Sequence, residues 1–161
     1  MIGSTGAERV PVEETTTMNI TRHDDNPWQE WRDGVMTRVW SGAISGATAA
    51  SGGEQLFAPG TGAPRHWHYY EEHITVLSGV AEFCVGDEVA IVEAPATLVF
   101  SPMQPHSFTN IGDQPLHILG FHPYPISHSM MEDDPTGTVT QSWEAGSDFR
   151  RRRLVESGAA I

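Results

Sequence analysis

The chain has 161 residues, with 21 acidic and nine basic side chains and a formal net charge of −12 at pH 7. This charge repels nucleic-acid phosphates and anionic membrane surfaces, so we expect neither as a partner. All nine basic side chains are Arg, which excludes chemistry that needs a lysine Schiff base or a lysine general base.

The length is typical of one domain. Cys84 is the one cysteine in the sequence, so no intrachain disulfide can form. The N-terminus lacks the basic start and apolar stretch of a signal peptide, and no apolar run is long enough to span a bilayer. These features predict a cytoplasmic protein.

The first 20 residues are rich in Thr, Glu, Gly and Pro and have no apolar periodicity, which predicts a disordered arm. Met18 is an alternative start of the natural chain. The barrel-forming region is expected over residues 21–125.

From Val35 onward, short apolar or alternating segments are separated by turn residues, and no helical period lasts ten residues before Pro125. This pattern is typical of an all-β jelly roll or small barrel. The predicted strands are residues 35–41, 47–58, 64–69, 73–78, 80–86, 88–92, 96–101, 106–111 and 115–121.

Residues 126–161 form a predicted C-terminal extension. Within it, the stretch "SWEAGSDFRRRRLVE" (residues 142–156) has two interpretations, one short helix or a disordered basic tail.

Four polar side chains have a spacing that suits a metal ion. His66 and His68 are two residues apart, so in a strand their side chains leave the same face with Cα atoms about 6.5 Å apart. Glu72 follows four residues later, and His106 lies between a turn and an alternating strand that could pair with the first. Three imidazoles and one carboxylate would hold a divalent ion and leave coordination positions open.

At these residues the chain resembles the cupin superfamily. Its first motif is G-x5-H-x-H-x(3,4)-E-x6-G, and "GTGAPRHWHYYEEHITVLSG" satisfies it from Gly60 through His66, His68 and Glu72 to Gly79. Its second motif is P-x-G-x2-H-x3-N. The stretch "SPMQPHSFTN" keeps the His and the Asn at this spacing but has Ser for Pro and Met for Gly.

The resemblance covers residues 50–122 and implies a double-stranded β-helix barrel with a metal inside. It implies that the ligands are His66, His68, Glu72 and His106. It also implies that Gly79 serves a turn and that Asn110 is structural.

Three other polar residues compete for a place in this site. Adjacent carboxylates cannot both face one pocket on an extended strand, and the family spacing selects Glu72, so Glu71 is expected to point outward. His73 is likewise expected to face away from the interior. Alternation groups His117 with Leu119 and Phe121, and His117 would lie beside the metal site only if that face is the interior. The preferred interpretation of His117 is a hydrogen-bonded core or surface residue.

Three hypotheses for function follow. The first is a dioxygenase that acts on an enolisable, diketone or phenolic substrate at the metal. The second is a redox-neutral lyase, isomerase or cyclase in which the metal is a Lewis acid and Glu72 or a nearby Tyr moves a proton. The third is a small-ligand-binding protein without catalysis. The first is our leading hypothesis, with a small molecule as the substrate.

The donor set does not select one metal. Iron is preferred for a dioxygenase, and manganese, nickel, zinc and copper accept the same ligands. The family's habit and the need to cover strand edges predict a homodimer.

Overall fold

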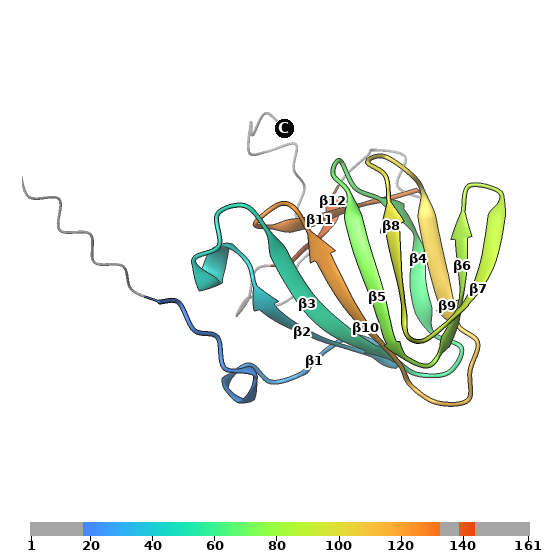
Figure 1. Cartoon of the computed structure of the whole chain (residues 1–161), viewed down its shortest axis with the longest axis horizontal. Helices are drawn as coiled ribbons and strands as arrows, with labels where there is room; N and C mark the ends of the chain where they lie inside the picture. The colour runs from blue at the N-terminus through green and yellow to red at the C-terminus, as the bar shows by residue number, and fades with distance from the viewer. Residues whose placement is uncertain (1–17, 133–138, 144–161) are drawn as a thin grey trace, which may run out of the picture.

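The computed structural model describes residues 18–132 and 139–143, and within these ranges the fold is all-β (Figure 1). Two single-turn 3₁₀ helices, η1 (His23–Asp25) and η2 (Ala43–Ser45), accompany the strands. The strands are β1 (Gln29–Arg32), β2 (Val35–Ser41), β3 (Ser51–Phe57), β4 (Gly62–Trp67), β5 (Glu72–Ser78), β6 (Val80–Val85), β7 (Glu88–Glu93), β8 (Ala96–Phe100), β9 (His106–Asn110), β10 (Leu116–His122), β11 (Ser127–Met131) and β12 (Val139–Trp143).

The strands form two six-stranded sheets, which pack face to face as a jelly roll. Their orders are β1-β2-β3-β10-β5-β8 and β12-β11-β4-β9-β6-β7. Every strand pair is antiparallel. Strands distant in sequence therefore become neighbours, and β9 is placed beside β4.

Each of the nine predicted segments overlaps a strand, and the all-β prediction is confirmed. The structure adds β1, β11 and β12, so the sheets continue beyond residue 125. Ser142 and Trp143, at the start of the segment interpreted as a helix or a disordered tail, belong to β12. Residues 144–156 of that segment and residues 1–17 of the predicted arm lie outside the described residues.

Alternating apolar residues of the two sheets build the core. In β2 the residues from Val35 to Val39 alternate between buried and half-buried. The rings of Phe57 and Phe108 meet edge to face at 4.9 Å, and the Phe83 ring lies 5.0 Å from that of Phe108. This aromatic cluster joins the sheets and leaves the polar side chains to one end of the barrel.

Asn110 and Gly79 have the structural roles that the resemblance implied. The buried Asn110 amide donates to the carbonyls of Phe57 and Gln114, both at 2.9 Å, and its Oδ1 accepts from Gly112 N at 2.9 Å. Gly79, with φ +93°, makes the tight turn between β5 and β6. Neither residue contributes to the polar end of the barrel.

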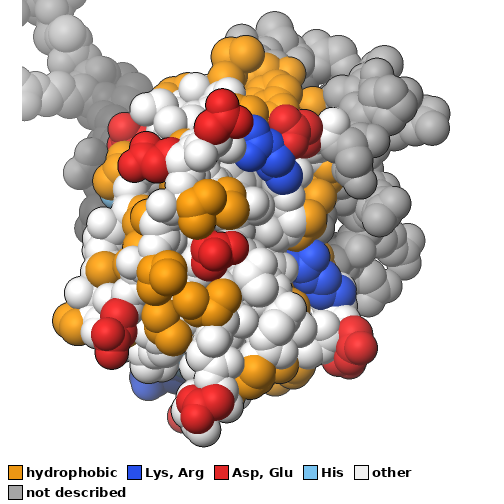
Figure 2. Space-filling model, turned by 90° about the vertical axis from the view of Figure 1, so that its right-hand side faces the viewer, with side chains coloured by type: hydrophobic (Ala, Val, Ile, Leu, Met, Phe, Trp, Pro, Cys, Tyr) orange, Lys and Arg blue, Asp and Glu red, His pale blue; other side chains and the backbone are white. Residues whose placement is uncertain are grey.

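The strands β7 and β8 end the two sheets at the same side of the barrel. Val89 and Ile91 of β7 and Val99 of β8 are exposed. On the face seen in Figure 2, hydrophobic side chains form small groups with acidic side chains between them. The predicted homodimer stays a prediction, which these exposed residues do not test.

Candidate metal centre

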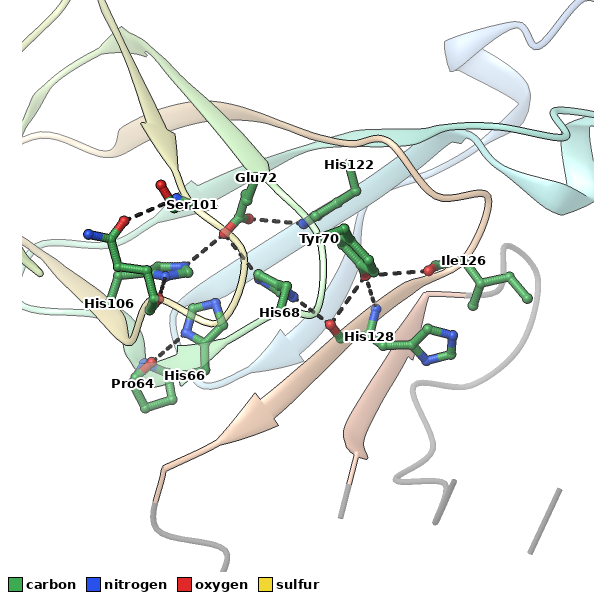
Figure 3. Close-up of polar contacts among 11 residues, drawn as sticks. Pro64, His66, His68, Tyr70, Glu72, Ser101, His106, His122, Ile126 and His128 are labelled. Atoms are coloured by element: carbon green, nitrogen blue, oxygen red, sulfur yellow. Dashed lines mark hydrogen bonds and ion pairs between the residues drawn. The ribbon is translucent and has the colours of Figure 1, made fainter. Parts of the chain in front are cut away.

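The four residues singled out by spacing come together inside the barrel (Figure 3). The β4–β9 register places His66 directly opposite His106. His68 follows β4 on the same face, and Glu72 begins β5 from the other sheet. One donor atom from each residue lies within 4.8 Å of the others, and all four side chains are buried.

The neighbouring polar residues point away from the cluster, as alternation predicts. The side chains of Glu71 and His73 are partly exposed and pair with each other, with Oε1 and Nε2 2.6 Å apart. Because successive side chains of an extended chain point to opposite faces, Glu72 points into the barrel while the residues on either side of it point out.

Backbone carbonyls orient the three imidazoles. Each ring directs Nδ1 at a main-chain oxygen: His66 at Pro64 O (2.7 Å), His106 at Gln104 O (2.8 Å) and His68 at His128 O. A carbonyl oxygen can only accept, so each Nδ1 carries a proton and Nε2 is the nitrogen left for a metal ion. Metal-binding histidines in proteins are commonly held in this way.

The contacts of Glu72 test whether the cluster suits a cation. Its Oε2 lies 3.0 Å from His68 Nε2 and 2.8 Å from His106 Nε2. With Nδ1 protonated on a neutral ring, these contacts would set lone pairs against a carboxylate oxygen. A proton or a metal ion between them removes the repulsion, so the donor set suits a divalent metal ion.

Burial and charge set the protonation of the cluster. Burial lowers the pKa of His66 to about 3, which leaves this ring neutral and ready to coordinate. Burial acts to raise the pKa of Glu72, but the charges of His68 and His122 outweigh it and hold that pKa well below its usual range. Burial likewise opposes the charged form of His68, yet the Glu72 charge raises its pKa overall.

The structure adds a residue that sequence reasoning missed. His122, at the end of β10, is buried and its Nε2 lies 3.0 Å from Glu72 Oε1. His122 is not one of the four clustered residues (Figure 3). It contacts Oε1 of Glu72, whereas His68 and His106 contact Oε2. Its contact leaves Glu72 Oε2 turned toward the imidazoles.

His117 lies on the opposite face, so the condition for placing it beside the metal site is not met. In β10 the buried residues are Leu116, Ile118, Gly120 and His122. His117 Nε2 instead lies 2.8 Å from Glu54 Oε2, on the outside of the sheet. The apolar phase of Leu116 and Ile118 was the signal in the sequence that could have identified His122.

A narrow cavity of about 30 Å³ adjoins the cluster. Its polar lining includes Gln55, whose buried Nε2 has no hydrogen-bond partner among the described residues. Gly120 also lines it, and a Cβ added there would meet nothing within 4 Å. The space can hold about one water molecule, so a larger molecule would fit only if part of the wall moved.

Metal affinity should rise with pH. In the metal-free protein the pKa of His68 is raised above its ordinary value of 6.5, so a metal must displace a proton from this ring near neutral pH. Below that raised pKa, the affinity should rise about tenfold per pH unit for each proton displaced. Titration calorimetry with Zn²⁺ from mildly acidic to mildly alkaline pH measures this slope, and a flat profile would contradict it.

A family model described as the cupin domain matches residues 53–122, which contain all four clustered side chains. This segment is a cupin domain. The resemblance carried by the two motifs is thereby confirmed. No curated protein matches the chain.

Solved structures share the fold of this cupin domain. KdgF from Halomonas sp. has 18% identity and a TM-score of 0.57, over 66% of this chain and 94% of that one. The polyketide cyclase RemF from Streptomyces resistomycificus has 20% identity and a TM-score of 0.58, over 66% and 80%. An oxalate decarboxylase from Bacillus subtilis, described for its Mn(II) centres, has 18% identity and a TM-score of 0.57, over 63% and 29%.

These identities support likeness of fold alone. The cupin fold therefore occurs in enzymes and in a protein with bound metal, and the cluster in this chain has donors that suit a divalent ion. Among residues 18–132 and 139–143, no helix is long and apolar enough to cross a membrane.

Proposed function

We propose that this chain is a metal-dependent enzyme that acts on a small enolisable, diketone or phenolic molecule. The observation that carries the proposal is the convergence of three carbonyl-oriented imidazoles and Glu72, with donor atoms within 4.8 Å of one another, beside a cavity. Residues His66, His68, Glu72 and His106 would hold the ion. A bound ion would supply Lewis acidity and, if redox-active, electron transfer.

The cavity wall supports binding of an oxygen-bearing substrate. The unpaired Gln55 Nε2 can donate to a carbonyl or phenolate oxygen, which would satisfy a buried donor that is otherwise costly. Ile74, Phe108 and Ile118 line the same cavity, and a bound substrate in contact with them would displace water from it. Gln55 would orient the substrate, and the apolar residues would keep the reacting end dry.

A dioxygenase with iron is our first candidate. A redox-neutral lyase, isomerase or cyclase is the second, and one observation favours it specifically. Glu72 and His122 lie 3.0 Å apart at the cavity, so a carboxylate and an imidazole are available there to move a proton on an enolisable substrate.

The test compares turnover with and without oxygen. Protein loaded with Fe²⁺ is screened against diketones, catechols and uronate-like acids, in air and under strict anaerobiosis. A dioxygenase should consume oxygen in step with substrate and be inactive without it. Anaerobic turnover would eliminate the dioxygenase and support the redox-neutral reaction.

Two controls complete this test. His66→Ala should be inactive in either atmosphere, whereas His73→Ala, which removes an imidazole outside the barrel, should retain activity. Ligand binding by metal-loaded protein without any turnover would instead support the non-catalytic hypothesis.

A further inference from the structure

The strand β11 lies over the candidate metal centre. Ser127, Ser129 and Met131 of this strand line the cavity. Its pairing with β4 is short and involves Met130 and Met131. The start of β11 pairs instead with β12, which is the edge strand of the sheet. By contrast, β10 pairs with β3 through seven residue pairs. The start of β11 is therefore joined to the barrel side of the sheet by contacts other than its pairing with β4.

Tyr70 makes the contacts that hold this end of β11 (Figure 3). Its hydroxyl accepts from His128 N at 2.5 Å. The same hydroxyl can donate to His128 O at 3.2 Å or to Ile126 O at 3.4 Å. The Tyr70 ring lies parallel to His68 at 5.5 Å and parallel to Tyr124 at 5.5 Å.

The peptide group held by Tyr70 also orients a candidate metal ligand. His128 O accepts from His68 Nδ1, and the same oxygen lies within reach of the Tyr70 hydroxyl. If β11 lifts, His68 loses the acceptor that fixes its tautomer and ring direction. Loss of such a partner typically costs 10- to 100-fold in metal affinity.

We propose that Tyr70 is a positioning residue that fastens β11 across the cavity, and that β11 is the strap which opens to admit substrate and closes to orient His68. The proposal rests on the proposed function, because it assumes that His68 holds a metal ion. The cavity of about 30 Å³ supports it, since the present arrangement is closed to any organic substrate. Strand β11 lines the cavity and contacts the candidate ligand His68 directly through His128 O, and the Tyr70 hydroxyl holds the same residue.

Tyr70→Phe tests the proposal, because it removes the hydroxyl and keeps the ring between His68 and Tyr124. Hydrogen–deuterium exchange of metal-free protein should show faster exchange in residues 127–131, by about tenfold. In Zn²⁺-loaded protein, EDTA should strip the metal about tenfold or more faster than from the wild type. Unchanged exchange and an unchanged stripping rate would overturn the proposal.

Two control variants separate fastening of β11 from general loss of stability. Tyr69→Phe removes the hydroxyl of the neighbouring exposed tyrosine and should match the wild type in both measurements. Leu116→Val weakens the core at the start of β10 and should leave the stripping rate unchanged. A rate increase in Leu116→Val equal to that in Tyr70→Phe would contradict a specific role for Tyr70.

The two proposals fail in different ways. If the wild type takes up no metal, the proposed function is wrong, and exchange in residues 127–131 alone decides whether Tyr70 fastens β11. If metal binds and the Tyr70→Phe variant behaves as the wild type, the assignment of the metal centre is supported and the proposed role of Tyr70 in fastening β11 is wrong.

Discussion

Replacing His106 by alanine should lower the affinity for a divalent metal by more than about 100-fold, because loss of a direct ligand should exceed the effect of losing an outer partner. His106 is almost fully buried, and its Nε2 faces Glu72 Oε2 at 2.8 Å. A competition titration of Zn²⁺ against a chromophoric chelator measures the affinity.

His73→Ala is the matched control for this experiment. It removes an imidazole one residue from Glu72, yet this ring pairs with Glu71 outside the barrel. Its metal affinity should equal that of the wild type, and thermal unfolding should show that both variants are folded. Equal loss of affinity in the two variants, or none in His106→Ala, would contradict the assignment of the cluster.

Replacing Gly62 by alanine should destabilise the barrel by more than about 4 kcal/mol, as expected for forced overlap within a packed sheet. A Cβ on Gly62 would lie 1.9 Å from Phe108 O and 2.6 Å from Thr109 Cα. Both are backbone atoms of β9, so the overlap can be relieved only by separating β4 from β9. That pairing also brings His66 to His106.

Gly120→Ala is the control for Gly62→Ala. Gly120 also lies inside a strand, but an added Cβ would meet nothing within 4 Å. Its free energy of unfolding in urea should stay within about 1 kcal/mol of the wild type. A Gly62→Ala variant as stable as Gly120→Ala would show that the β4–β9 contact is looser than described.

The metal cluster could be predicted from the sequence because most of its residues lie close together in the chain, at the spacing of alternating strand residues. His66, His68 and Glu72 lie within seven residues, and alternation separates Glu72 from Glu71 and His73. His106 was identified through its spacing to Asn110. Met103 stands where that motif has Gly, and it adopts φ 61°, so the turn keeps its left-handed backbone without a glycine.

The parts that sequence reasoning missed depend on tertiary contacts. Alternation in β10 offers two faces, and which face is interior is decided by the neighbouring sheet, so His122 was missed. The segment of β11, "SHSMM", shows no apolar alternation. Its position depends on Tyr70 and His68, which are about 60 residues earlier in the chain. The polar sequence of β1, "QEWR", likewise shows no apolar alternation. This strand is recognised only through its pairing with β2.

The most direct test of the metal centre is elemental analysis of the purified wild-type protein, followed by removal of metal with EDTA and titration with Fe²⁺, Mn²⁺ and Zn²⁺. The donor set of three imidazoles and one carboxylate predicts a single transition-metal ion per chain, restored by titration at a stoichiometry of one. A folded protein that contains no transition metal and takes up none would contradict the account.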